Sequence, residues 1–336
     1  MAQRFLDLGR EDRADILQAL ASRLGRTALV LEKDVWVCWT LESLFALRGR
    51  RAMAFKGGTS LSKVYGAIAR FSEDLDITID CRGLVAPFDP FSGTASGSSR
   101  KKYGKALSAA MVRHVREVLE PQLATELKRQ FQGTCHIELE DGAEKLRVRY
   151  ESALPPSAGY LERSVLVEFG GRNSLEPSEP RTLRAYMSGQ ADDLEFPVAS
   201  VTVLRPERTF WEKATLIHVE CMRSELKAGK DRLSRHWYDL AMLADHDIGQ
   251  RALSDRALLA DVVRFKSVYY RNTHASYEDC IDGRLRLTPD PAMAVGLRSD
   301  FEQMVASGMF EGQPPLFEDI MARLQRLEKA INDRAG

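Results

Sequence analysis

Apolar residues recur at helical spacing near the start of the chain and again in its last third. Residues 4–24 are predicted to form an amphipathic helix that stops near Gly25, and residues 30–47 a second, more buried helix. From about residue 205 the pattern is again mostly helical, and Pro206 suits the first turn of a helix. Further helices are expected around residues 234–246, 256–271, 299–308 and 315–334.

Strand-like runs occupy the middle of the chain. Residues 52–55 and 74–80 are the first two, separated by a turn and a short helical run. Later runs between residues 134 and 203 are also rich in β-branched and alternating positions, so we expect them to extend the same sheet. The pattern predicts an α/β (α+β) domain over residues 1–204, followed by an α-helical C-terminal domain over residues 205–336.

Two segments follow the second strand run. Residues 82–99 are rich in Gly, Pro and Ser, and we expect a mobile loop outside the core that either closes over a substrate or merely connects two elements. Residues 101–129 return to a helical pattern with a basic outer surface. Its basic residues are Arg100, Lys101, Lys102, Lys105, Arg113, Arg116, Lys128 and Arg129.

The turn between the first two strand runs can bind phosphate. Gly57 and Gly58 let the backbone turn tightly and approach a ligand closely. Thr59 or Ser60 can cap the helix that follows, and free N–H groups at a helix start attract phosphate. The predicted nucleotide-binding residues of this unit are Lys56, Gly57, Gly58, Thr59, Ser60 and Ser72.

Asp74 and Asp76 stand two residues apart in the second strand run. On a strand such residues point to the same face, with Cα atoms roughly 6.5–7 Å apart. Two carboxylates at this spacing can share divalent cations, and Mg²⁺ takes one or two carboxylates together with substrate phosphates. Each motif alone is commonly structural, but together they indicate attack on an α-phosphate with a metal-bound pyrophosphate leaving group.

A further carboxylate lies within the apolar run of residues 165–169. Glu168 is predicted either to be a third metal ligand or to pair with Arg147, Arg149 or Arg172, since a buried carboxylate needs a partner. The residues alone leave these alternatives open.

The run KGGTSLSKVY followed by RFSEDLDI resembles the DNA polymerase β-like nucleotidyltransferase superfamily, and more specifically its AbiEii/AbiGii family of bacterial toxins. The gap from Gly58 to Asp74 is longer than in many polymerase-like members, but the toxin family tolerates it. Residues 207–214, 234–240 and 285–291 also resemble this family. The resemblance implies a mixed sheet in the N-terminal domain and an active site in a cleft between the domains.

The triplet Glu32-Lys33-Asp34 matches the family as well. Its simpler interpretation is a solvated, charged first turn of a helix, which we favour slightly over a role in the site. Lys33 could still reach a phosphate if this helix packs near the Gly-Gly turn.

The resemblance assigns roles to two residues of the C-terminal domain. Lys213 would neutralise the β- and γ-phosphates. Asp239 would either orient Lys213 or accept a proton from the attacking hydroxyl, with a buried salt bridge to Arg235 as the structural alternative. Arg235 is also a predicted nucleotide-binding residue, whereas a lone histidine such as His236 is more often structural.

The function implied is a Mg²⁺- or Mn²⁺-dependent nucleotidyltransferase toxin of a toxin–antitoxin or phage-defence (abortive infection) system. It would transfer NMP from NTP to RNA, with the 3′ end of tRNA as the expected acceptor and a cognate antitoxin as its partner. A protein hydroxyl as acceptor, and an inactive nucleotide-binding partner protein, are the alternatives; the intact Asp74/Asp76 pair argues against the second. Backbone contacts by residues 101–129 would serve RNA binding. The cluster of Lys266, Tyr269, Tyr270 and Arg271 has two possible roles, either stacking on RNA bases or packing of the tyrosines in the core.

Composition narrows this interpretation only slightly. The 336 residues are 44% hydrophobic and 29% charged, which is ordinary for a soluble globular protein. The formal net charge of +0 argues against a histone-like binder, so RNA affinity must come from a local surface. Five scattered cysteines without a CxxC spacing, and an N-terminus without an apolar signal stretch, predict reduced thiols, a cytoplasmic protein and no membrane association.

Overall fold

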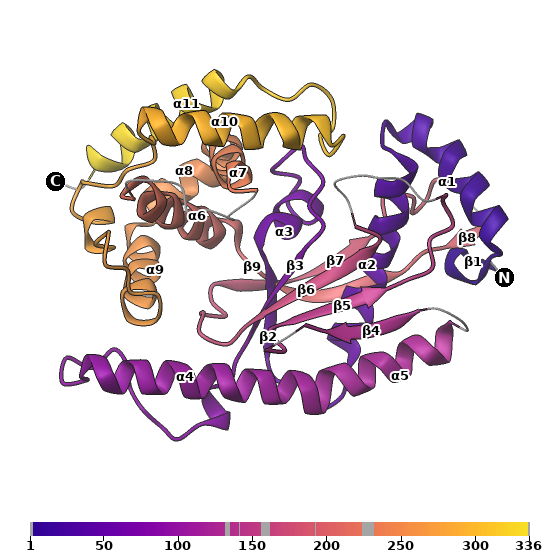
Figure 1. The fold of residues 1–336 in the computed structure, drawn as a ribbon, viewed down its shortest axis with the longest axis horizontal. Helices are drawn as coiled ribbons and strands as arrows, with labels where there is room; N and C mark the ends of the chain where they lie inside the picture. Colours follow the sequence, from indigo (N-terminus) through magenta and orange to yellow (C-terminus); the bar gives the residue numbers. More distant parts are fainter. Residues whose placement is uncertain are drawn as a thin grey trace. The chain divides into compact units, whose positions relative to one another are not determined.

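The computed structural model describes residues 3–131, 135–140, 142–155, 162–191, 193–223 and 232–334, and the chain divides into two compact units (Figure 1). Unit 1 consists of Met1–Val64, Arg70–Pro87 and Lys105–Val203. Unit 2 consists of Tyr65–Ala69, Phe88–Gly104 and Leu204–Gly336. Two segments that precede residue 204 in sequence therefore belong to the C-terminal, mainly helical unit.

The larger sheet among the described residues has seven strands in the order β4-β5-β6-β3-β2-β9-β7. β3 pairs with β2 antiparallel and with β6 parallel, and β5 is antiparallel to both β4 and β6, so the mixed sheet is confirmed. Its strands are β2 (Met53–Lys56), β3 (Leu75–Ile79), β4 (His136–Leu139), β5 (Lys145–Arg149), β6 (Ser164–Gly170), β7 (Ser178–Arg184) and β9 (Val198–Leu204). Two short strands, β1 (Gln3–Arg4) and β8 (Leu194–Glu195), pair separately.

The helices of the first half begin with α1 (Arg10–Leu24), preceded by a 3₁₀ turn at Phe5–Asp7, and continue with α2 (Ala28–Ala46) and α3 (Gly57–Lys63). Thr27 caps α2 by accepting a hydrogen bond from the Val30 amide at 3.2 Å. The predicted helix over 101–129 is part of a longer stretch. That stretch comprises α4 (Gly97–His114), a π-helical segment (Val115–Leu119) and α5 (Glu120–Gln130).

The core of unit 1 forms around α2, because this helix is apolar on nearly all sides. Trp36 is 1% exposed and stacks on Tyr150 of the chain after β5, with ring centroids 4.8 Å apart. The ring centroid of Phe131, which follows α5, lies 4.9 Å from that of Trp36. Aromatic packing thus joins α2 to both the helical stretch and the sheet, and it positions α2 beside the strands that carry the predicted site.

Unit 2 is built around α6, which Pro206 begins as predicted. Phe210, Trp211 and Ile217 are fully buried, and α6 packs against three helices, α7, α8 and α9. The helices are α6 (Pro206–Cys221), α7 (Ser234–Asp245), α8 (Asp247–Ser254), α9 (Arg256–Tyr269), α10 (Pro291–Ala306) and α11 (Phe317–Asn332). Helix α8 was not predicted, and α10 begins earlier than predicted because Asp290 caps it by accepting from the Met293 amide at 2.8 Å.

Part of the predicted loop 82–99 is folded onto α9. The Phe91 ring lies 4.8 Å from that of Phe265 and 6.0 Å from that of Tyr269, and Arg264 covers Phe91 at 4.4 Å. Tyr269 therefore takes part in aromatic packing although it is only partly buried, and base stacking by this cluster stays a prediction. Mobility of the rest of the segment stays a prediction.

In the part of the chain that the structure describes, no helix is both long and apolar enough to cross a bilayer.

Candidate active site

The Gly-Gly turn lies directly against Asp76 of strand β3, which we call the acidic strand. Helix α3 begins at Gly57, which has a φ of +83°, and a Cβ atom there would lie 2.0 Å from Asp76 Oδ2. A Cβ on Gly58 would lie 2.7 Å from Ser72 Oγ and 2.9 Å from Arg70 Nη2. The positive φ and the Asp76 carboxylate both favour glycine at position 57, whereas a side chain at position 58 would force Ser72 or Arg70 to shift.

The prediction that Thr59 or Ser60 caps the helix is wrong. Lys56 occupies the cap position without a side-chain capping bond, so Thr59 and Ser60 lie inside α3. Both are fully buried. The Thr59 hydroxyl donates to the carbonyl of Asp74 at 2.6 Å, and that of Ser60 to the carbonyl of Gly57 at 2.8 Å. These hydroxyls tie the turn to itself and to the acidic strand; phosphate binding by the two residues stays a prediction.

Four charged residues form a row across neighbouring strands of the sheet. Asp76 on β3 is opposite Lys56 on β2 and opposite Glu168 on β6, and Glu168 is opposite Lys145 on β5. Residues in register on neighbouring strands point to the same face, so the signs along this row run plus, minus, minus, plus. Asp74 precedes β3 by one residue and, like Asp76, is partly exposed, whereas the alternate residues Leu75 and Ile77 are buried.

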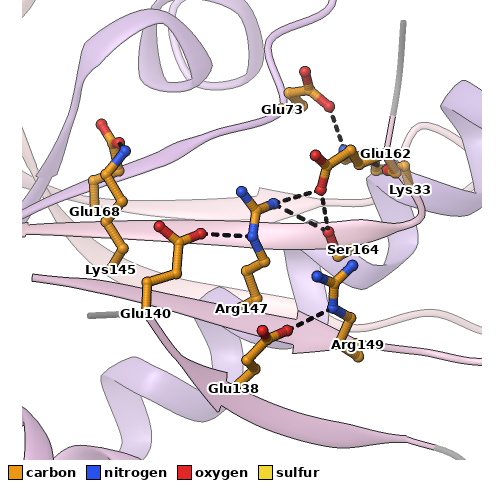
Figure 2. A network of polar contacts seen from close by, with 10 residues as sticks. All are labelled: Lys33, Glu73, Glu138, Glu140, Lys145, Arg147, Arg149, Glu162, Ser164 and Glu168. Carbon is orange, nitrogen blue, oxygen red and sulfur yellow. Dashed lines mark hydrogen bonds and ion pairs between the residues drawn. The ribbon is translucent and has the colours of Figure 1, made fainter. Parts of the chain in front are cut away.

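Glu168 forms an ion pair, but with none of the three predicted arginines. Lys145 Nζ lies 2.5 Å from Glu168 Oε1, and the Glu168 side chain is 35% exposed rather than buried. Arg147 instead bonds to Glu140 at 2.7 Å and to Glu162 at 2.6 Å (Figure 2). Among the described residues, no group of three or more His, Cys, Asp or Glu side chains is placed to hold a metal. Metal binding by Glu168 stays a prediction.

The triplet on α2 is buried, so its interpretation as a solvated turn is wrong. Glu32, Lys33 and Asp34 are 1%, 2% and 0% exposed. Glu32 accepts hydrogen bonds from the Ser152 hydroxyl and the Ala153 amide, both at 2.6 Å. Burial raises the pKa of Glu32, and these two bonds oppose that rise.

Lys33 ties α2 to the chain just before the acid pair. Its ammonium forms an ion pair with Glu73, the neighbour of Asp74, and donates to the carbonyl of Glu162 at 2.7 Å (Figure 2). Both side chains of the pair are almost fully buried. The Lys33 ammonium therefore fixes the position of the chain that leads into the acidic strand.

Asp34 ties the same helix to α3. It forms a buried ion pair with Lys63 and accepts from the Tyr186 amide at 2.7 Å, while Lys63 Nζ lies 3.9 Å from the centre of the Tyr186 ring. Burial is the largest single influence on the pKa of Lys63 and lowers it, but Asp34, Cys38 and Tyr186 together raise the pKa above its ordinary value. The ammonium thus stays charged, and α2 holds both the Gly-Gly turn and the acidic strand.

In unit 2, Lys213 of α6 and Asp239 of α7 form an ion pair of 2.9 Å, with side chains 9% and 0% exposed. This contact corresponds to the predicted role of Asp239 in orienting Lys213. His236, which sequence reasoning set aside, lies beside them, with its Nδ1 3.4 Å from Lys213 Nζ. Its position one helical turn before Asp239 is the signal that could have found it. That this group and Arg235 face Asp74 and Asp76 stays a prediction.

Comparison with known families decides the class of this chain. A family model described as "Nucleotidyl transferase AbiEii toxin, Type IV TA system" matches residues 39–323. The chain belongs to this family. The AbiEii-family chain is therefore a nucleotidyltransferase toxin of a type IV toxin–antitoxin system, and the family implies an NTP substrate and an antitoxin partner.

A solved structure supports the fold of this AbiEii-family chain. MenT4, a nucleotidyltransferase toxin from Mycobacterium tuberculosis H37Rv, is similar with a TM-score of 0.51 and 20% sequence identity, over 97% of this chain and 90% of that chain. At this level of identity the similarity establishes the fold alone. No curated protein matches the chain.

We predict that Gly57→Ala will displace Asp76 as well as strain the backbone. The matched control is Gly49→Ala, because Gly49 has a similar φ of +68° but no atom within 4 Å of the place that a Cβ would occupy. Backbone strain alone should cost each variant about 1–3 kcal/mol. Urea unfolding should show a larger loss for Gly57→Ala, and divalent-metal binding should weaken in that variant alone. Equal effects of both substitutions would contradict the close approach.

We predict that Lys33→Met will destabilise the protein by about 3–5 kcal/mol, because it removes one half of the buried Lys33–Glu73 ion pair. The double variant Lys33→Met/Glu73→Leu should recover most of that loss, since an apolar pair can replace a buried ion pair. Urea unfolding curves of the two variants and the unaltered protein measure this. A double variant less stable than Lys33→Met would show that the two residues do not act as a pair.

Proposed function

We propose that this AbiEii-family chain transfers NMP from an NTP to RNA, with the 3′ end of tRNA as acceptor, at a site built on Asp74 and Asp76. The observation that carries the proposal is the contact of the Gly57 turn with the Asp76 carboxylate. This contact brings a backbone turn that can approach a phosphate next to a carboxylate that can bind the divalent cation of that phosphate. In this proposal the toxin acts in the cytoplasm, and growth arrest limits phage.

The residues present fit a divalent metal. Asp76 on β3 and Asp74, one residue before it, are two partly exposed acids, and Gly57 next to them has no side chain. A hard cation such as Mg²⁺ or Mn²⁺ that takes one or two carboxylates, and completes its shell with phosphate oxygens and water, suits this donor set. When bound, the metal would stabilise the negative charge that develops on the transferring and leaving phosphates.

Two lysines would bind the triphosphate. Lys56 is in register with Asp76 on the neighbouring strand and precedes Gly57, so its side chain extends from the same face of the sheet as that of Asp76. Lys213 would neutralise the β- and γ-phosphates, as the family resemblance implies. The buried Asp239 fixes the position of the Lys213 ammonium at 2.9 Å. Preorganisation of this kind favours the developing charge without a cost for reorganising the side chain.

We infer that Asp239 orients Lys213 rather than accepting a proton from the acceptor hydroxyl. Its side chain is completely buried and already bonded to a cation. A carboxylate that accepts a substrate proton must come within hydrogen-bond reach of that substrate. The ion pair and the burial of Asp239 therefore favour the orienting role.

We predict that Asp76→Asn will lower transfer at least about 100-fold, because an amide is a poor Mg²⁺ ligand and the metal's charge stabilisation is worth several kcal/mol. The assay is incubation with labelled NTPs, total RNA and cell protein, and circular dichroism checks that the variant is folded. Label in RNA supports the proposal. Label confined to protein would indicate a protein acceptor, absence of label an inactive binding protein, and near-normal transfer by Asp76→Asn would refute the metal assignment.

The exposed start of α4 is the proposed contact for the RNA backbone. Lys101, Lys102 and Lys105 are exposed, whereas Arg100 is partly buried and donates to the Ser92 carbonyl at 3.1 Å. Lysines of this kind neutralise phosphates and release counterions, which makes binding depend on salt. Arg100 is therefore left out of the test below.

We predict that changing Lys101, Lys102 and Lys105 together to Gln will weaken RNA modification and flatten its salt dependence, by about 0.7 in log–log slope for each lost contact with single-stranded RNA. Lys128→Gln/Arg129→Gln, at the exposed far end of α5, is the control and should leave the slope unchanged. Transfer rate is measured against salt, with NTP affinity measured separately. Identical slopes for the triple variant and the unaltered protein would remove this surface from the RNA site.

A further inference from the structure

The neighbour of Asp76 on β6 is held by a lysine. Glu168 is directly opposite Asp76 in the register of β3 and β6, so the two carboxylates point to the same face of the sheet. Yet Lys145 Nζ lies 2.5 Å from Glu168 Oε1, and Asp74, Asp76 and Glu168 do not form a three-acid metal group. A third acid is thus in register with the proposed metal site but is engaged elsewhere.

The ion pair that holds Glu168 can open at little cost. The side chains of Lys145 and Glu168 are 46% and 35% exposed, in contrast to the buried pairs made by α2. Exposed pairs are weak because water screens them, and their long side chains are ordered only at a cost in entropy. A divalent cation beside Asp76 would attract Glu168 more strongly than one ammonium does, since its charge is twice as large.

The surroundings of Lys145 supply the released ammonium with other partners. Its hydrogen bond to Glu168 is the main cause of a raised pKa, and the charges of Glu140 and Asp74 raise it further. Figure 2 shows Glu140 between the Lys145–Glu168 pair and Arg147, to which Glu140 bonds at 2.7 Å. Lys145 can therefore leave Glu168 and remain near negative charge, including that of a bound phosphate.

We propose that Lys145 is a positioning residue that holds Glu168 away from the metal site, and that a divalent cation on Asp74 and Asp76 recruits Glu168 by displacing Lys145. The inference rests on the proposed function, because it requires the metal to bind at the two aspartates. It makes metal binding a competition between a resident ammonium and an incoming divalent ion for one carboxylate.

The test is Mn²⁺ binding to the full chain without nucleotide, measured by calorimetry or by the spin resonance of free Mn²⁺. Lys145→Met should tighten binding about two- to fivefold, the range that corresponds to the loss of an exposed ion pair. Lys145→Arg, which keeps the pair, should bind as the unaltered protein does. Glu168→Gln should weaken binding, and Lys145→Met should have no further effect in that background.

A matched control separates this competition from a general effect of charge. Arg149 lies on the same face of β5, is 40% exposed and pairs with Glu138 at 2.8 Å (Figure 2). Arg149→Met removes the same charge without releasing Glu168, so Mn²⁺ affinity should not change. Unchanged affinity in Lys145→Met, or tightening that persists with Glu168→Gln or also appears in Arg149→Met, would overturn the inference.

Mn²⁺ binding by Asp76→Asn shows whether a failed test refutes only the role of Lys145 or the metal site itself. If this variant loses Mn²⁺ binding while Lys145→Met binds normally, the metal site stands and only the role of Lys145 is refuted. If Asp76→Asn binds Mn²⁺ normally, the metal site of the proposed function is refuted and the inference with it.

Discussion

The arrangement of the acidic strand and the turn depends on two ion pairs buried beneath them. Lys33 and Asp34 are adjacent on α2, and each pairs with a charge of opposite sign from a different segment. Removing a charge from water is costly unless it is paired and hydrogen-bonded, so the segments that carry Glu73 and Lys63 must lie where α2 places its own charges. An apolar interface could be as stable, but it would not specify these positions as strictly.

The charged face of the sheet has a different character. Its charges are partly exposed and pair between neighbouring strands, as Lys145 does with Glu168 and Arg149 with Glu138. Such pairs contribute little stability, because water and salt screen them. The molecule thus places its buried ion pairs where the backbone must be held, and its weak ones on the sheet face that carries Asp76.

Local features of the site could be predicted from the sequence, whereas contacts between distant strands could not. The Gly57 turn and the Asp74/Asp76 spacing are encoded within one unit of about twenty-five residues, and the structure places both as neighbours. The partner of Glu168 depends on the register of β5 and β6, which no local pattern specifies, so Lys145 was missed. The burial of Glu32, Lys33 and Asp34 was also missed, because a run of charges is ordinarily solvated and its partners lie far away in sequence.

The same limit applies to the elements of the fold. The apolar periodicity of α2 and α6 was enough to predict both helices. Strand β7 was not predicted, because its sequence SEPRTLR is mostly polar. It is an edge strand of the sheet, and most of its residues are partly or fully exposed to solvent. The pairing of Lys213 with Asp239 joins two helices, and only the resemblance to a family brought these residues together beforehand.

The way the chain passes between its two units has a consequence for its assembly. It crosses from one to the other after Val64, Ala69, Pro87, Gly104 and Val203. A fragment ending near residue 204 would carry Tyr65–Ala69 and Phe88–Gly104 without the helices they belong with, leaving the ring of Phe91 without Phe265. Neither unit can be released by a single cut, and the sheet cannot complete its own chain before parts of its partner are synthesised. Folding of unit 2 must therefore wait for the last third of the sequence, which supplies helices α6 to α11, although every segment of unit 1 has been synthesised by residue 203.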